Sequence, residues 1–416
     1  MKLSNQYTCL LLDSGGGWCG DQRKTPSYIA FNQPEISFSS NGGEVTIKSH
    51  GSTKLINADP LEVLDDYLNQ GYVAVGYIGY EFSQYTNEGF SPAHKKDGLK
   101  FPDVSFLLYK LEGLVVGDFA ELGRDLQPPE ITEELLPDRP IDPSFHLCPN
   151  MSIYQYNDMI KQGKSYIEQG DIYQVNLSQR MITRFNLDPF SYFRRFYEVQ
   201  PVPFGCYIDF GDFQLQSGSM ELFLRKKGSK LVTNPIKGTI KRGKTEEIDT
   251  IMKAKLISSA KERAENLMIV DLMRNDLGRV SKTGSVKVNK LFEVETYSTL
   301  HQMVSEVEGE VDENIKASQI VRSVFPPGSV TGAPKRRALE VIDELEPHLR
   351  GPYCGTIGVF YPNGDFTLSV AIRILLTQSG KATFFVGGGI VWDSDPEKEF
   401  DETILKSEAI TKAMGA

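Results

Sequence analysis

Apolar and polar residues follow short strand-like and helix-like patterns in the first part of the chain. Residues 44–48 alternate in the manner of a half-buried strand. Three leucines between residues 60 and 69 have helical spacing, with Asp59 as an N-cap and Gly71 after the end. Residues 72–82 are apolar and interrupted by glycines, which indicates a buried strand that passes close to other backbone. The first 110 residues therefore predict strands and turns with one helix.

Beyond residue 150 the patterns are longer. Ser152 and Gln155 have the spacing of a capping box, and a helical face then runs to Gly170. Apolar residues at 173, 175 and 177 alternate with amides and a hydroxyl at 174, 176 and 178, which predicts a strand with one apolar and one polar face. A long helix is predicted over about 246–272 and a last helix over 395–413. Further strands are expected near residues 204–210, 222–225, 231–233, 286–297, 353–360, 366–376 and 382–386.

A proline-rich, acidic stretch separates these two parts of the chain. Six prolines lie between residues 126 and 149, which is the composition of a linker. We therefore expect an N-terminal region over 1–125, a linker over 126–149 and a larger catalytic region over 150–416. The last region is mixed α/β and holds more strands than a strict βαβ alternation would give.

Composition narrows the classes of partner. The 416 residues are 40% hydrophobic and 24% charged, as in ordinary globular proteins, and the formal net charge is −10. An acidic chain is a poor match for nucleic acid or an anionic membrane, so we expect neither as a partner.

Five scattered cysteines without C-x-x-C spacing indicate reduced thiols, and no signal peptide or membrane-length apolar run is visible. The sequence predicts a cytoplasmic protein.

Two glycine-containing stretches are candidates for chemistry, each with an ordinary alternative. Lys237 lies between Pro235 and Gly238, so it is either an amine held in place by rigid backbone or a solvated hairpin lysine. Gly387–Gly389 either exposes amides to an anion or forms a turn that requires positive φ. Residues 328–335 superficially resemble a phosphate loop, but Ala333-Pro334 breaks the Walker pattern, so no nucleotide site is predicted.

Carboxylates on two predicted helices suggest a metal site. Glu265 has apolar neighbours, so its carboxylate needs a cation such as Mg²⁺ unless that helix face is solvated. Glu399, Glu402 and Lys406 share one stripe of the last helix, either as a surface ion pair or as a second metal carboxylate beside a lysine. His301 lies in a strand-like stretch where a lone histidine is usually structural, and no Ser/His/Asp set is visible.

Six ordered motifs resemble those of the chorismate-utilising enzymes. The resemblance covers nearly all of residues 150–416, and it is weaker in the N-terminal region, at residues 11–14 and 77–82. The motifs are residues 170–177, 235–239, 271–279, 301–309, 327–335, and 387–391 together with 393–406. The resemblance implies a fold of the α/β (α+β) class, in which one large intertwined body has facing antiparallel sheets and helices packed outside. It also implies one Mg²⁺-dependent site for chorismate.

The resemblance also assigns roles to individual residues. Glu265 and Glu402 would hold Mg²⁺, Glu221 would be the acid that assists departure of the 4-hydroxyl, and Lys237 would be a nucleophile. Met220 stands where the family has proline before that acid. The remaining implied residues are Tyr353 and Arg373 at the enolpyruvyl carboxylate, and Gln174, His301, Thr331, Gly388 and Lys406 around the pocket, with His301 among the catalytic groups.

Two positions separate the reactions within the family. Members that add water have a lysine base where this chain has Gln174, and members that make anthranilate have alanine where it has Lys237. The resemblance thus implies amination of chorismate at C4 through a covalent Lys237 intermediate, towards 4-aminobenzoate and folate. Ammonia would come from glutamine through a separate glutaminase subunit in a heterodimer. The alternatives are C2 amination with loss of pyruvate, or a non-catalytic anion-binding scaffold. Residues 11–14 resemble a tryptophan-binding stretch, with Asp13 in place of glutamate.

Overall fold

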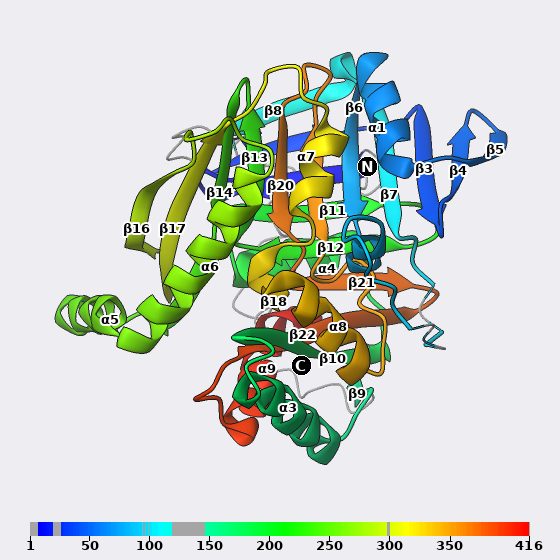
Figure 1. Ribbon diagram of the computed structural model, residues 1–416. Helices are drawn as coiled ribbons and strands as arrows, with labels where there is room; N and C mark the ends of the chain where they lie inside the picture. The colour runs from blue at the N-terminus through cyan, green and yellow to red at the C-terminus, as the bar shows by residue number, and fades with distance from the viewer. Residues whose placement is uncertain are drawn as a thin grey trace.

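The computed structural model describes residues 7–19, 26–93, 95, 97–98, 100–118, 146–297 and 300–415. Within these ranges two antiparallel sheets form the body of the protein and helices cover it (Figure 1). The first sheet has ten described strands in the order β18 (Gly332–Ala333), β10 (Gln174–Arg184), β22 (Lys381–Ile390), β21 (Ile374–Gln378), β12 (Gln214–Ser219), β11 (Phe204–Asp209), β1 (Cys9–Asp13), β2 (Ser27–Phe31) and β8 (Leu114–Asp118), with β9 (Cys148–Pro149) beside β10.

The second sheet has twelve described strands. Their order is β15 (Ile236–Lys241), β17 (Leu300–Glu310), β14 (Lys230–Asn234), β13 (Leu222–Lys227), β20 (Phe366–Val370), β19 (Thr356–Phe360), β6 (Tyr72–Ile78), β7 (Val104–Lys110), β3 (Ile36–Asn41), β4 (Glu44–Ser49) and β5 (Ser52–Asn57), with β16 (Lys287–Thr296) beside β17. The main apolar core includes side chains of both sheets; Tyr77 of β6, for example, packs edge-on against Phe210, which follows β11, at 5.6 Å. The expected intertwined α+β fold is confirmed.

The N-terminal and C-terminal parts share both sheets. Strand β1 pairs with β11, and β6 pairs with β19. Each sheet therefore contains strands from both the N-terminal and the C-terminal part of the chain. Of the expected linker over 126–149, residues 126–145 lie outside the described residues, and Cys148–Pro149 forms β9 against β10. The extended runs in the N-terminal region are therefore edges and interior strands of the same two sheets that carry the later motifs.

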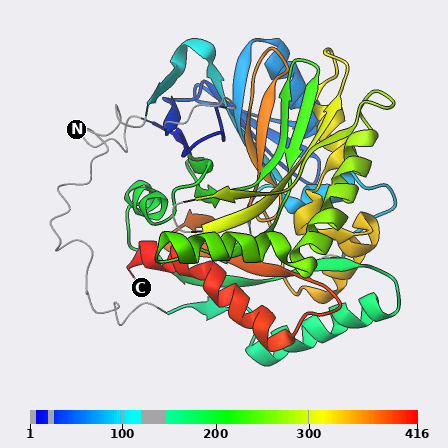
Figure 2. The same cartoon turned by 90° about the vertical axis from the view of Figure 1, so that its left-hand side faces the viewer.

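Helices cover the outer faces and carry part of the site. The described helices are α1 (Pro60–Asn69), α3 (Ile153–Glu168), α4 (Pro189–Val199), α5 (Glu246–Ser258), α6 (Ala260–Gly278), α7 (Ala317–Val324), α8 (Lys335–Leu345) and α9 (Pro396–Met414), with 3₁₀ turns at Tyr80–Tyr85, Leu111–Gly113 and Gly328–Val330. Figure 2 shows α9 below the α5–α6 pair, on the side of the molecule that carries the candidate site. No helix among the described residues has the length and apolar character needed to cross a bilayer.

Local signals placed several helices correctly. Asp59 caps α1 by accepting from the Leu61 amide, and Ser152 and Gln155 form the predicted capping box of α3. The single helix predicted over 246–272 is wrong. Ser259 is extended (φ −68°, ψ 110°) and its side chain accepts from the Glu262 amide, so it ends α5 and caps α6. The break turns α6, and with it Glu265, towards the sheets.

Two strand predictions need correction. Residues Gln174, Asn176 and Ser178 are as buried as Val175 and Leu177, because both faces of β10 are covered, while Tyr173 lies before the strand and is 68% exposed. The three glycines at 387–389 lie inside β22, and their φ angles are not positive. They therefore do not form a turn, and their lack of side chains leaves room beside the strand.

A buried ion pair joins β10 to the turn at residues 328–331. Arg350 donates to both oxygens of Glu346 at 2.8 and 2.7 Å, and each side chain is 1% exposed. The same guanidinium donates to the carbonyl oxygens of Asn176 (2.7 Å) and Val330 (3.1 Å). Since the guanidinium, held by Glu346, donates to backbone both in β10 and in the turn at residues 328–331, it fixes the relative position of these two segments.

We expect Arg350→Met to lower the free energy of unfolding by about 3–5 kcal/mol, because it leaves the Glu346 carboxylate buried without its cation. Urea unfolding followed by circular dichroism would measure the change. Arg337→Met is the matched control, since Arg337 is about one-third exposed in its ion pair with Asp171, and it should change stability by about 1 kcal/mol or less. Equal losses in the two variants would contradict this interpretation.

Candidate active site

Lys237 is held at an irregularity of β15. The pairing of β15 with β17 shifts register between Ile236 and Thr239, and Gly238 has φ +89°. A side chain at Gly238 would lie 3.0 Å from Glu262 and 3.1 Å from Leu256, and this tight fit together with the positive φ favours glycine at the α5–α6 junction. The amine of Lys237 donates to the carbonyl oxygen of Ser329 at 3.2 Å. Burial lowers the pKa of this amine, and the nearby carboxylates of Glu221 and Glu265 oppose that shift.

Glu221 faces the same amine from the connection between β12 and β13. Its side chain is 6% exposed, and burial raises the pKa of the carboxyl to about 7. Three interactions keep the pKa of the Glu221 carboxyl lower than burial alone would: a hydrogen bond with Ser329, the charge of Lys237 and a hydrogen bond with the amide of Ile236. Met220 packs against an apolar cluster and its sulfur lies 2.6 Å from Gln302 Nε2. The carboxyl thus still faces Lys237 with methionine in the preceding position.

Gln174 provides a buried polar group without a protein partner. Its side chain is fully buried, and neither Nε2 nor Oε1 makes a hydrogen bond. A side chain at Gly389 would lie 2.9 Å from Nε2 of Gln174 and 3.5 Å from Nζ of Lys237. The glycine therefore leaves a space that both groups border. An orphaned buried amide is costly unless a ligand or water completes its hydrogen bonds.

A second group of charges surrounds Gly388. Lys406 on α9 donates to Glu402 Oε1 at 2.5 Å and to the carbonyl oxygen of Gly387 at 2.8 Å. A side chain at Gly388 would lie 3.1 Å from Glu399, 3.7 Å from the Lys406 amine and 3.8 Å from Glu402. Burial alone would raise the pKa of Glu402, but the ion pair with Lys406 brings this pKa below its usual value.

The carboxylates around this space fit a loosely held divalent cation. Glu265 on α6 interacts electrostatically with both Lys237 and Glu399, and burial raises the pKa of its carboxyl. Among the described residues no three His, Cys, Asp or Glu side chains form a ready-made metal cluster. Mg²⁺ usually takes only one or two protein carboxylates and completes its shell with water and substrate oxygens. Glu265 on α6 and Glu402 on α9 can supply these two carboxylates.

Tyr353 and Arg373 border the same region. Tyr353 is 5% exposed and stacks on Phe385 with ring centroids 5.1 Å apart, and Arg373 interacts electrostatically with Tyr353 and Glu402. Burial lowers the pKa of the Arg373 guanidinium, which donates to the Lys406 carbonyl oxygen from a backbone with φ +52°. A positive φ is uncommon in a non-glycine residue, and here it occurs at the residue immediately before β21.

His301 and Thr331 are occupied by protein contacts. The two ring nitrogens of His301 lie 2.9 Å from Thr296 Oγ1 and 2.9 Å from Asp249 Oδ1. The Thr331 hydroxyl donates to the carbonyl oxygen of Pro327 at 2.8 Å within its own turn. Each side chain is thus committed to positioning neighbouring backbone and helices in this state of the protein.

The structure also identifies neighbours that the motifs did not single out. The Ser329 carbonyl holds the Lys237 amine, and Glu399 lies nearest to the space beside Gly388. The common stripe of Glu399, Glu402 and Lys406 on α9 was the available signal for the carboxylate. A backbone carbonyl leaves no such signal, because its direction depends on the turn and not on residue type.

The chain is similar to known proteins over most of its length. The family model described as chorismate binding enzyme matches residues 8–412, so the chain belongs to that family of enzymes. It is 35% identical to aminodeoxychorismate synthase component 1 of Bacillus subtilis, over 93% of this chain and 88% of that protein. It is 42% identical to anthranilate synthase component 1 of Aquifex aeolicus, over 64% of this chain and 54% of that protein. The structure of anthranilate synthase component I from Streptococcus pneumoniae has a TM-score of 0.78 and 29% identity, covering 92% of each chain.

The space beside Gly388 leads to a testable expectation. We expect Gly388→Ala to weaken chorismate binding about tenfold or more, because the added carbon lies 3.1 Å from Glu399 and forces that carboxylate to move. Isothermal titration with chorismate would measure the dissociation constant. Gly113→Ala is the control, since nothing lies within 4 Å of a carbon added there. Unchanged binding by Gly388→Ala would show that the substrate does not use this space.

Proposed function

We propose that this chain is the large subunit of an aminodeoxychorismate synthase, which replaces the 4-hydroxyl of chorismate with an amino group from ammonia. The observation that carries the proposal is the desolvated Lys237 amine beside the protonatable Glu221 carboxyl, in a chain of the chorismate-binding family. A nucleophile and an acid that face one space provide the two groups that displacement of a ring hydroxyl requires.

The first half of the reaction uses these two side chains. The neutral Lys237 amine attacks C2 of the ring, the ring double bonds shift, and the bond between C4 and its oxygen breaks. Glu221 gives its proton to the departing oxygen, which leaves as water. Burial supports both roles, because it lowers the pKa of the Lys237 amine and raises that of the Glu221 carboxyl to about 7.

The second half reverses the covalent step. Ammonia attacks C4, the double bonds shift back, and the bond between C2 and Lys237 breaks, while the proton lost by the nitrogen returns to the Glu221 carboxylate. Chorismate and ammonia thus give 4-amino-4-deoxychorismate and water, and the enolpyruvyl group stays attached. Gln174 has no titratable group to activate water, which favours amination over hydration in this space.

The remaining residues bind and orient the substrate. Arg373 and Tyr353 suit the enolpyruvyl carboxylate, since a guanidinium matches a carboxylate bidentately. Glu265 and Glu402 would hold Mg²⁺, which would neutralise the ring carboxylate when bound. The pocket is further shaped by Lys406, Gly388, Thr331 and His301. Contacts with Asp249 and Thr296 hold the His301 ring in a fixed position.

Ammonia is supplied in this proposal by a separate glutaminase subunit. The name of the Bacillus subtilis relative, component 1, describes one part of a multi-component synthase. The product is the precursor from which 4-aminobenzoate for folate is made. We place the reaction in the cytoplasm, consistent with five cysteines that are all free in the structure.

Anthranilate synthesis is the second candidate. The 42% identity to a component 1 of anthranilate synthase favours it over the part of the chain that aligns. That reaction puts the amino group on C2 and releases pyruvate, and an amine at Lys237 that reaches C2 would occupy the carbon that ammonia must attack. The position of Lys237 therefore favours amination at C4.

The chain should be tested with chorismate, Mg²⁺ and ammonium at mildly alkaline pH, with products separated by chromatography. We expect aminodeoxychorismate without pyruvate, and a loss on the order of 10³-fold or more in Lys237→Ala, because the nucleophile and its acid act as a unit. Lys241→Ala, an exposed lysine on the same strand, is the control. Anthranilate with pyruvate from the wild type would overturn the proposal, as would near-normal rates in Lys237→Ala.

Glu221 should set the alkaline side of the pH profile. The reaction needs Glu221 protonated, a fraction that falls as pH rises through about 7, and Lys237 neutral, a fraction that grows as pH rises. We therefore expect a bell-shaped profile of kcat/KM in the wild type. Glu221→Gln should be slower by about 10²–10⁴-fold and should no longer lose activity at high pH. A decline at high pH that persists in Glu221→Gln would exclude Glu221 as the acid.

A further inference from the structure

The first turn of α6 carries a lysine that the site described above does not use. Lys261 Nζ lies 3.8 Å from Oε1 of Glu265, one turn further along the same helix. Burial acts to raise the pKa of the Glu265, Glu399 and Glu402 carboxyls, and the positive charge of Lys261 opposes this effect on all three. One ammonium group therefore interacts with the three carboxylates around the candidate metal site, although two of them come from α9.

Local helix energetics do not account for a lysine at this position. The first turn of a helix carries partial positive charge, which favours acidic side chains and disfavours basic ones. In pairs four residues apart, glutamate before lysine is the more stabilising order, and here the lysine comes first. The pair of Glu402 and Lys406 on α9 has the favourable order. The position of Lys261 is therefore better explained by the carboxylates around it than by its own helix.

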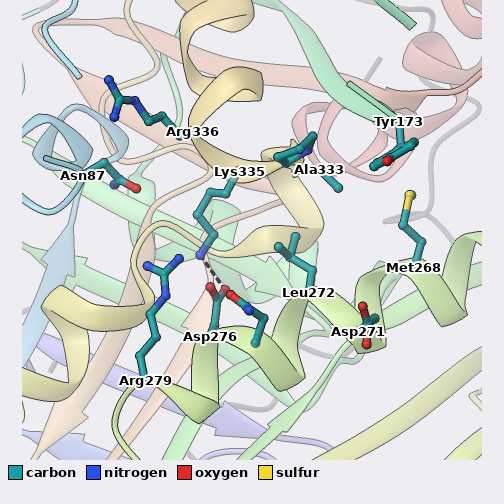
Figure 3. Close-up of a pocket in the computed structure, with 12 residues that line it drawn as sticks. Asn87, Tyr173, Met268, Asp271, Leu272, Asp276, Arg279, Ala333, Lys335 and Arg336 are labelled. Carbon is teal, nitrogen blue, oxygen red and sulfur yellow. Dashed lines mark hydrogen bonds and ion pairs between the residues drawn. The ribbon is translucent and has the colours of Figure 1, made fainter. Parts of the chain in front are cut away.

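The pair between Lys261 and Glu265 is open to exchange. The Lys261 side chain is 55% exposed, so its ammonium group can withdraw into water on a flexible stem at little cost. A second lysine–carboxylate pair on α6 shows the contrast (Figure 3). Asp276 and Lys335 lie 2.6 Å apart with side chains 1% and 6% exposed, and Lys335 also donates to the Val324 carbonyl oxygen. That pair is sealed from water, whereas the pair at Glu265 is not.

We propose that Lys261 is the counter-cation of the metal site before Mg²⁺ binds, and that it gives way when Mg²⁺ binds. This inference rests on the proposed function, in which Glu265 and Glu402 hold that ion. Without the metal, the ammonium group offsets the mutual repulsion of the carboxylates. A divalent ion brings more positive charge to the same oxygens, so the lysine then moves into water. The Mg²⁺ affinity of the site is therefore set by the exchange of one cation for another.

Thermal unfolding at increasing Mg²⁺ concentration tests this exchange, because a ligand of the folded state raises the melting temperature according to its dissociation constant. We expect Lys261→Met to melt below the wild type without Mg²⁺ and to bind Mg²⁺ about tenfold more tightly, since no ammonium group competes for the carboxylates. Arg274→Met is the matched control. Arg274 lies on the same helix, is 52% exposed and pairs with Asp271 at 3.0 Å, so this variant removes the same charge and should keep the wild-type Mg²⁺ affinity.

Lysine acetylation mapped by mass spectrometry shows whether the Lys261 side chain moves. Lys261 should react faster when Mg²⁺ is present. Lys412 is the internal control, since it is 61% exposed and pairs with Glu408 at 3.6 Å on α9, and its reaction rate should not change. Wild-type Mg²⁺ affinity in Lys261→Met, or a Lys261 reaction rate that ignores Mg²⁺, would overturn the inference.

Glu265→Gln separates this inference from the proposed function. If the wild type binds Mg²⁺, Glu265→Gln does not and Lys261→Met matches the wild type, the metal site stands and only the role of Lys261 is wrong. A wild type whose melting temperature does not respond to Mg²⁺ would overturn both the metal site and the role of Lys261.

Discussion

The coupling between the Lys237 amine and the Glu221 carboxyl is the interaction on which the rest of the site depends. Glu221 is buried and Lys237 is half-buried, and burial disfavours the charged form of each group. The charge of Glu221 opposes this effect on Lys237, and the Ser329 hydrogen bond together with the charge of Lys237 opposes it on Glu221. The Ser329 turn completes the arrangement by binding both of them. An amine and a carboxyl that share one desolvated space exchange a proton at small cost, which is what a nucleophile and its acid require.

The architecture serves this pair by bringing four separate segments to it. The register shift in β15 presents Lys237, the β12–β13 connection presents Glu221, the turn after α7 presents Ser329, and the glycines of β22 clear the space. The Arg350–Glu346 pair then locks that turn to β10. Because early strands such as β1 and β6 complete both sheets, the N-terminal region supports the site without supplying the residues assigned to it.

The sequence predicted those features that depend on residue type at short range, and missed those that depend on distant packing. The cap at Asp59 and the capping box at Ser152 were read correctly because each is a local contact. Ser259 was missed as a helix boundary, since it interrupts an otherwise continuous helical composition. The two-sided burial of β10 and the contact of His301 with Asp249 were equally invisible, because α8 and Asp249 are distant in sequence from the residues that they contact.

The distribution of charge explains how one scaffold can direct an amine to different ring carbons. Gly388 leaves room beside Glu399, Lys406 and Glu402, and the next residue, Gly389, leaves room beside Gln174 and Lys237. The charges of Glu265 and Glu402 also act on the Lys237 amine, so the two groups belong to one site. In the proposed reaction, a substrate whose carboxylates are held beside Gly388 has its ring near Lys237. Whether that position offers a lysine then decides which carbon remains open to ammonia. In the proposed mechanism, the position of Lys237, more than the shape of the shared pocket, therefore determines the product.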